Sequence, residues 1–401
     1  MSLIDLADLK DNERAVGSEA RTVKTKTVYL LGAGFSKPAG MPLATEVLPL
    51  LMKSGRKDDS QDDDRDDEMT AWLADLQKRV EWLEGGGSGH RGLNIEEVFH
   101  LGHFDAEVHR LKQQLCPVGR SSGETPWQTA EDIEGWLSYL EEALVDVLVQ
   151  KESEARESKA NLDQITRWAR TVCEADTVVT FNYDTLVERA FEALDRHWNH
   201  GFKLENGAGV TVFELHGSID WIVADRDAQL AKCELLFDKP NANRSNVRTG
   251  HVEDDCRLWR CRDRRQIRAW INGHHIQKLR QGAWPTTPGV AGLGAHKELH
   301  RVPGLGRTWA GAMRAVRDAD QLVVVGFSMS DFDTMARLQL SYVARTRHEE
   351  EPPLPVIVID PAADCSPFQA RFTRVFHDGV RFVRKSHEQF NWGTLRKTAV
   401  D

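Results

Sequence analysis

One run near the amino terminus constrains the fold more than any other stretch of the chain. Residues 27–36 read TVYLLGAGFS, an apolar β-type segment that breaks into a glycine turn. The apolar part is typical of a strand buried in a parallel sheet. Gly32 and Gly34 carry no Cβ, so the turn can be sharp and its backbone can come close to a ligand. N–H groups in such a turn, together with the Ser36 hydroxyl, suit a pyrophosphate. The run fails the G-x-G-x-x-G fingerprint because Lys37 stands where the third glycine belongs.

Later apolar runs are predicted to be further strands, each delivering polar residues at its carboxyl end. They lie at 177–182, 210–215, 322–325 and 356–359, and they lead into Asn182-Tyr183-Asp184, His216-Gly217-Ser218, Gly326-Phe327-Ser328 and Asp360. A single turn of this kind is usually turn chemistry. In an open parallel sheet, however, ligands bind outside the carboxyl ends of the strands, so the series predicts one shared site. Asp184 is also predicted to be the N-cap of the helix that follows it.

Between the first two strands the periodicity is helical. Apolar residues recur at three- and four-residue spacing from Trp72 and again from Ile133, and Asn94 with Glu97 forms a capping-type pair. The acidic run 56–68 is predicted to be a solvated loop. The fold class expected is α/β, a Rossmann-like parallel sheet flanked by helices with an inserted all-helical subdomain. The predicted units are an N-terminal extension (1–26), the Rossmann-type domain (27–51 and 171–401), the helical insertion (52–170) and a loop-rich, Arg-rich insertion within that domain (225–304).

Composition excludes several classes of protein. The chain has 401 residues, a net charge of −10, no segment that reads as a signal peptide, anchor or membrane span, and six scattered cysteines. These features predict a cytoplasmic protein with free thiols and no membrane association. A zinc site could in principle draw on Cys233, Cys256, Cys261, His251, His274 and His275, but the chain has no Cys-x-x-Cys and this spacing is atypical, so no metal is expected.

The segment from Arg257 to Arg268 is the one strongly basic stretch, with Trp259 inside it and Trp270 just beyond. Arginine interleaved with tryptophan can contact phosphates and stack on bases. An exposed helix or loop is the favoured interpretation, and a nucleic-acid or partner contact is the alternative.

Taken together, these motifs resemble those of the sirtuin-like superfamily of NAD-binding proteins. The resemblance implies that NAD+ is bound by Gly32, Ala33, Gly34, Phe35, Ser36, Pro42, Gly326, Ser328 and Asp360, and that His216, Asn182 and Asp184 are catalytic. The chain lacks the two Cys-x-x-Cys pairs that hold zinc in protein deacylases, and Phe181 replaces their Gln. These departures make it similar to the bacterial branch that hydrolyses NAD+ in antiphage defence by abortive infection.

The residues suggest how such a reaction would run. Nicotinamide leaves a pyridinium as a neutral molecule through an oxocarbenium-like transition state, so a base and an oriented water suffice. His216 is the candidate base, Asn182 would position water or ribose, and Asp184 would orient the site. The predicted activity is NAD+ glycohydrolysis to nicotinamide and ADP-ribose. A protein deacylase and a non-catalytic sensor of NAD or ADP-ribose are the alternatives.

Regulation is expected from outside the catalytic fold. Proteins that this chain resembles are often paired with a helicase-type ATPase, an Argonaute-like protein or a fused sensor. Because no sensor is recognisable in this sequence, control by homo-oligomerisation, a separate defence partner, or both is predicted.

Overall fold

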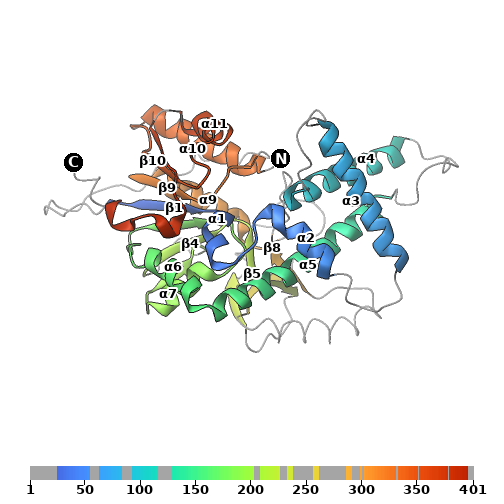
Figure 1. Ribbon diagram of the computed structural model, residues 1–401, viewed down its shortest axis with the longest axis horizontal. Helices are drawn as coiled ribbons and strands as arrows, with labels where there is room; N and C mark the ends of the chain where they lie inside the picture. The colour runs from blue at the N-terminus through green and yellow to red at the C-terminus, as the bar shows by residue number, and fades with distance from the viewer. Residues whose placement is uncertain are drawn as a thin grey trace, which may run out of the picture.

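A computed structural model gives the three-dimensional structure of the protein (Figure 1). It describes residues 25–54, 63–83, 93–115, 129–202, 208–225, 233–237, 256–261, 286–290, 299, 302–330, 333–350, 352–377 and 379–395. The predicted N-terminal extension (1–26) therefore lies almost wholly outside the described residues.

A seven-stranded, all-parallel sheet forms the centre of the molecule, in the order β11-β10-β9-β1-β2-β4-β3. Its strands are β1 (Thr27–Leu31), β2 (Thr177–Thr180), β3 (Trp198–His200), β4 (Val210–Glu214), β9 (Gln321–Val325), β10 (Val356–Ile359) and β11 (Val380–Val383). The strands predicted from apolar runs are all present. The order reverses between β1 and β9, and such a reversal opens a crevice at the carboxyl ends of the two strands.

Side chains alternate along the strands between two buried faces. In β1, Tyr29 and Leu31 face one hydrophobic cluster, while Val28 and Leu30 face the other. The first face is covered by α1 (Ala33–Ser36), α6 (Lys159–Ala169) and α7 (Leu186–Ala193), and the second by α9 (Leu305–Arg317), α10 (Thr334–Glu350) and α11 (Ser366–Phe376). Burial on both faces explains why these strands are continuous apolar runs.

All the regular secondary structure described between β1 and β2 is helical, which confirms the predicted inserted helical block. It contains α2 (Ala44–Ser54), α3 (Asp63–Leu83), α4 (Ile95–Leu115), α5 (Ala130–Glu157) and α6. The Asn94 cap is confirmed, because its Oδ1 accepts from the Glu96 N–H and its own N–H donates to Glu97. The acidic run differs from expectation, since α3 already begins at Asp63. The predicted unit boundaries stay predictions.

A second sheet follows His216 and was not predicted. It is antiparallel, in the order β6-β7-β5-β8, and contains β5 (Gly217–Asp225), β6 (Glu234–Phe237), β7 (Cys256–Arg260) and β8 (Thr286–Val290). Part of the predicted loop-rich insertion is therefore strand. Arg260 is buried in β7 and its Nε donates to Asp220 at 2.6 Å, so this arginine is no solvated side chain. Residues 262–268 of the basic segment lie outside the described residues.

Candidate active site at the carboxyl edge of the sheet

The predicted site residues follow neighbouring parallel strands and therefore gather at one edge of the sheet. The turn 32–36 follows β1, Asn182 follows β2, His216 follows β4, and Gly326 follows β9. The first and last of these turns meet at the point where the strand order reverses. The sequence thus predicted correctly which strand ends share an edge.

Two glycine turns cross at this reversal. The Gly32 N–H donates to Val325 O at 3.0 Å, and the Gly34 N–H donates to Gly326 O at 2.9 Å. A Cβ on Gly32 would lie 2.6 Å from Gly326 O, and a Cβ on Gly326, where φ is +60°, would lie 2.2 Å from the Phe35 nitrogen. These approaches of backbone to backbone require glycine at both places. The sequence predicts that these glycines allow a ligand to approach, and the crossing of the two turns is a further reason for them.

Ser36 joins Asn182 to Asp184. The Asn182 Nδ2 donates to Ser36 Oγ at 3.0 Å, and the Ser36 hydroxyl donates to the Asp184 carboxylate. All three side chains are buried. This chain of hydrogen bonds turns the Asn182 amide so that Oδ1 points away from Ser36, and among the described residues that buried oxygen accepts no hydrogen bond. A buried acceptor without a partner costs free energy, which is recovered when a ligand hydroxyl or water donates to it.

The pKa of Asp184 lies well above that of an ordinary aspartate. Burial, followed by the charge of the nearby Glu152 carboxylate, raises it to about 7 against the opposing effect of hydrogen bonds from Ser36 and the Leu186 N–H. The N-cap of α7 is Thr185 and not Asp184 as predicted, although Asp184 Oδ1 does accept from the Leu186 N–H at 3.2 Å. Asp184 is therefore linked to Asn182 through the Ser36 hydroxyl.

His216 lies between aromatic rings from the end of β2. Its ring centroid is 5.2 Å from that of Phe181 and 5.5 Å from that of Tyr183, the two residues that flank Asn182. Its Nε2 is 3.7 Å from Asp333 Oδ2, and both residues are buried. A histidine held beside a carboxylate is a common arrangement for a general base, because the carboxylate stabilises the imidazolium that forms.

Tyr183 packs beside His216, and its hydroxyl is influenced by carboxylates of the helical block. Burial and the carboxylates of Glu96 in α4, Glu141 in α5 and Asp333 raise the pKa of its hydroxyl well above the ordinary value. The phenol therefore stays protonated and can donate a hydrogen bond at neutral pH.

The remaining predicted binding residues are placed less centrally. Phe35 is fully buried and its ring packs against Trp168 and His387, so only its backbone faces the turn. Ser328 is exposed, and Ala33 and Pro42 are half-buried. Asp360 Oδ1 accepts from the Ala362 N–H at 2.8 Å within its own turn, and burial raises its pKa.

Sequence reasoning gave no role to Asp333, Tyr183 or Glu152. Tyr183 stands in the Asn182-Tyr183-Asp184 motif, and Asp333 follows the Gly326-Phe327-Ser328 motif by five residues, but nothing in either motif indicates contact with His216. Glu152 carried a signal that could have found it, since it continues the apolar stripe of Leu144 and Leu148 at four-residue spacing and is buried. An acid on an apolar stripe needs a partner.

The described residues contain no group of three or more His, Cys, Asp or Glu that could hold a metal ion. Cys233 and Cys261 contact each other, and burial and this contact raise the pKa of the Cys233 thiol to about 12. The side chain of Cys256 and all of His251, His274 and His275 lie outside the described residues. In the part of the chain that is described, no helix has the length and apolar character needed to cross a membrane.

Comparisons with known proteins found likeness only among solved structures. No protein-family model matches the chain, and no curated protein matches it. A Sir2 structure with the inhibitor EX-527, 2′-O-acetyl-ADP-ribose and a deacetylated p53 peptide aligns over 94% of this chain and 95% of its own, at 12% identity and a TM-score of 0.34. A Sir2 homologue in complex with ADP-ribose aligns over 94% of each chain at 16% identity and a TM-score of 0.32. Likeness at these scores is too weak to bear on chemistry, which rests on the side chains described above.

Proposed function

We propose that the protein is an NAD+ glycohydrolase that cleaves NAD+ to nicotinamide and ADP-ribose. The observation that carries the proposal is that His216, beside Asp333, packs against Phe181 and Tyr183, the two neighbours of Asn182, whose buried Oδ1 accepts no hydrogen bond among the described residues. A base and a hydrogen-bond acceptor next to a glycine turn are the groups that this hydrolysis requires. The resemblance of the motifs to sirtuin-like NAD-binding proteins gives the substrate class.

In the proposed reaction the bond between the ribose C1′ and the nicotinamide nitrogen breaks, and its electron pair stays on nicotinamide. A water oxygen forms the new bond to C1′, and its proton passes to His216. Asn182 Oδ1 accepts a hydrogen bond from that water or from a ribose hydroxyl and so fixes its orientation. Asp333 stabilises the imidazolium, and the products leave as nicotinamide and ADP-ribose.

Release of nicotinamide from NAD+ by the purified protein tests the proposal, with neighbouring gene products added as candidate activators. His216→Ala is expected to lower the rate at least about 100-fold, the size of a typical general-base contribution. His377→Asn is the matched control, because His377 is exposed and its positive φ of 53° is tolerated by asparagine. Full activity in His216→Ala would show the assignment to be wrong.

The products separate the proposed activity from its alternatives. A deacylase would release nicotinamide only with an acylated peptide and would form an acylated ADP-ribose. A sensor would bind NAD+ or ADP-ribose without turnover under every activator. Free ADP-ribose in equal amount to nicotinamide, without any acyl acceptor, is the result that the glycohydrolase requires.

The biological role included in the proposal is that of an abortive-infection effector in the cytoplasm, restrained by self-assembly or by a defence partner such as a helicase-type ATPase or an Argonaute-like protein. NAD+ measured in infected cells is expected to fall with the wild-type chain and its gene neighbours and to persist with His216→Ala. Unchanged NAD+ in both would remove the defence role and leave the hydrolysis to be judged in vitro.

A further inference from the structure

Helix α5 joins the helical block to the edge of the sheet where the candidate site lies. It has 28 residues and is therefore about 42 Å long. Near its amino end Trp136 packs against Trp72 of α3 with ring centroids 5.3 Å apart. Its other end runs to α6 and α7 beside the sheet (Figure 1). One continuous helix therefore connects the helical block to the elements beside the sheet.

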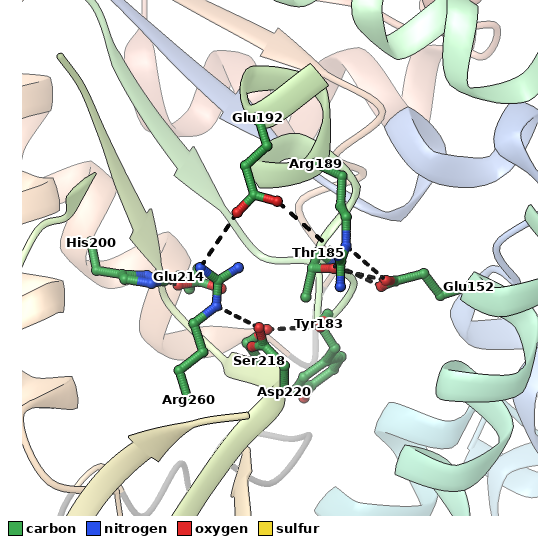
Figure 2. A network of polar contacts seen from close by, with 10 residues as sticks. All are labelled: Glu152, Tyr183, Thr185, Arg189, Glu192, His200, Glu214, Ser218, Asp220 and Arg260. Atoms are coloured by element: carbon green, nitrogen blue, oxygen red, sulfur yellow. Dashed lines mark hydrogen bonds and ion pairs between the residues drawn. The ribbon is translucent and has the colours of Figure 1, made fainter. Parts of the chain in front are cut away.

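Near the end beside the sheet, α5 places one buried carboxylate, that of Glu152, at the first turn of α7. Glu152 Oε2 accepts from the Thr185 N–H at 2.8 Å, and Oε1 accepts from Thr185 Oγ1 at 2.7 Å. Arg189 Nε lies 3.9 Å from Oε1 (Figure 2). Both oxygens accept hydrogen bonds at a helix amino terminus, where a negative charge is favoured. Glu152 thus fixes the position of Thr185.

Thr185 adjoins Asp184, so the contact continues into the site. Asp184 accepts from Ser36, and Ser36 accepts from Asn182. The Asn182 Oδ1, which accepts no hydrogen bond among the described residues, is the other end of that amide. The groups that face Asp184 are Glu152 from α5, Ser36 from α1 and the Leu186 N–H from α7. Each step from Glu152 to Asn182 is a hydrogen bond or a peptide bond.

A chain of ion pairs extends from the same glutamate toward the second sheet. Arg189 Nη1 lies 4.0 Å from Glu192 Oε2, Glu192 Oε1 lies 3.9 Å from Arg260, and Arg260 binds Asp220 (Figure 2). Three of these links, counting the one between Glu152 and Arg189, are long and therefore weak. The strong contact of Glu152 is the one with Thr185.

We propose that Glu152 is a positioning residue through which the helical insertion controls the site: its contact with Thr185 holds Asp184, and through Ser36 it sets the Asn182 amide. A partner or a second copy that displaces α5 would then alter the site without touching it. The consequence for catalysis rests on the proposed function, whereas the coupling itself does not.

The titration of the Asp184 carboxyl tests the coupling without reference to activity. In protein labelled with ¹³C at the aspartate carboxyls, the Asp184 signal is assigned by its loss in Asp184→Asn. Glu152→Gln removes the charge that raises the pKa of Asp184, so the midpoint is expected to fall below about 7. Glu154→Gln is the matched control on the same helix, exposed and paired with Lys151, and should leave the midpoint unchanged. An unchanged midpoint in Glu152→Gln overturns the proposal.

Glu152→Asp guards against a variant that fails to fold. It keeps the charge but withdraws it by one methylene, and a smaller shift in the same direction is expected. An unchanged midpoint here also counts against the proposal.

Nicotinamide release then separates this inference from the proposed reaction. If NAD+ is cleaved, Glu152→Gln is expected to lower kcat about 10-fold with little change in KM and to move the acidic limb of the pH profile downward, because an active-site group is misplaced while binding persists. A shifted midpoint without any nicotinamide would sustain the coupling and refute the reaction. Nicotinamide release with unshifted midpoints and pH profiles would support the reaction and refute the coupling.

Discussion

Asp333 has two contacts that can be separated experimentally. Oδ1 accepts from the Ala336 N–H at 3.2 Å at the start of α10, and Oδ2 lies 3.7 Å from His216 Nε2. Asparagine is as good a helix cap as aspartate but carries no charge. The cap is therefore a matter of stability, and the charge beside His216 is a matter of catalysis.

Asp333→Asn is expected to keep the melting temperature and to lower kcat about 10- to 100-fold, because the imidazolium formed in the reaction loses its carboxylate partner. Asp333→Ala should lose both and cost about 1 kcal/mol of stability. Steady-state kinetics and thermal unfolding of the two variants check this. Equal kcat in wild type and Asp333→Asn would remove Asp333 from the catalytic group.

Residue identities at the strand ends could be predicted, but their partners could not. Ser36 was expected to donate to a phosphate, and its hydroxyl instead links Asn182 and Asp184, which stand about 146 positions further along the chain. Glu152 and Thr185 are likewise far apart in sequence, at a separation of 33. Periodicity and capping rules act over a few residues, so a hydrogen bond that depends on how two elements pack lies beyond them.

The crossing of the β1 and β9 turns requires glycine at position 326. Gly326→Ala would put a Cβ 2.2 Å from the Phe35 nitrogen and 2.3 Å from the Gly34 carbonyl carbon, at a φ that alanine disfavours. We expect a loss of about 3 kcal/mol or more, measured by urea unfolding.

Gly306→Ala is the control for that substitution. Gly306 lies in α9, and a Cβ there would meet no atom within 4 Å. Alanine should therefore be neutral or stabilise by about 0.5–1 kcal/mol, because it is the better helix former. Similar stability of the two variants would show that the crossing is less tight than described.

The junction of α7 and β4 buries two acids against each other. Burial and the neighbouring Glu214 raise the pKa of Glu188 well above its ordinary value, and burial with the charge of Asp220 raises the pKa of Glu214 to about 8. His200 Nδ1 lies 2.7 Å from Glu214 Oε2, and burial lowers the pKa of His200 to about 4, so the imidazole is neutral above that pH (Figure 2). The folded protein thus holds protons on this pair that the unfolded chain releases near its ordinary pKa of 4.5.

Stability should consequently fall as the pH rises through the folded-state pKa of this pair. Between pH 7 and pH 9 His200 is already neutral, and the wild type is expected to lose stability. The Glu188→Gln variant is expected to lose less, because a neutral amide stays beside Glu214. The difference expected at pH 9 is about 1.4 kcal/mol or more, the equivalent of one pKa unit. Urea unfolding at both pH values measures it, with the exposed Glu174→Gln as control. A pH dependence identical in all three proteins would contradict it.

The strands of the first sheet could be predicted from their own sequences, whereas those of the second could not. The parallel strands were predictable because burial on both faces selects unbroken apolar runs such as Val356–Ile359. The antiparallel strands gave no such signal: Thr286–Val290 contains Pro288 and Gly289, and Cys256–Arg260 contains two arginines. Arg260 is accommodated because Asp220, 40 positions away, pairs with it.

For the whole molecule, the question is whether the helical block can loosen while the sheet remains folded. Gly102 in α4 faces Leu137 of α5 and Trp72 of α3, and a Cβ there would lie 2.8 Å from Leu137 Cδ2 and 3.1 Å from the Trp72 ring. A side chain at this position separates the three helices. One hydrophobic cluster nevertheless runs from these helices through α2, α5 and α6 to the sheet face.

Gly102→Val is expected to speed amide hydrogen exchange in α3, α4 and the first half of α5 and to leave β1 and β9 protected, because cooperative units of different stability open separately. Phe104→Ala, at an exposed position of the same helix, is the control. The Thr185 amide donates to Glu152, so its exchange reports whether loosening reaches the site. Faster exchange at Thr185 with β1 and β9 still protected would mean that α5 carries motion of the block to Asp184. Uniformly faster exchange that includes β1 and β9 would mean that the helical block and the sheet unfold as one unit. Control of the site by displacement of α5 alone would then have no physical basis.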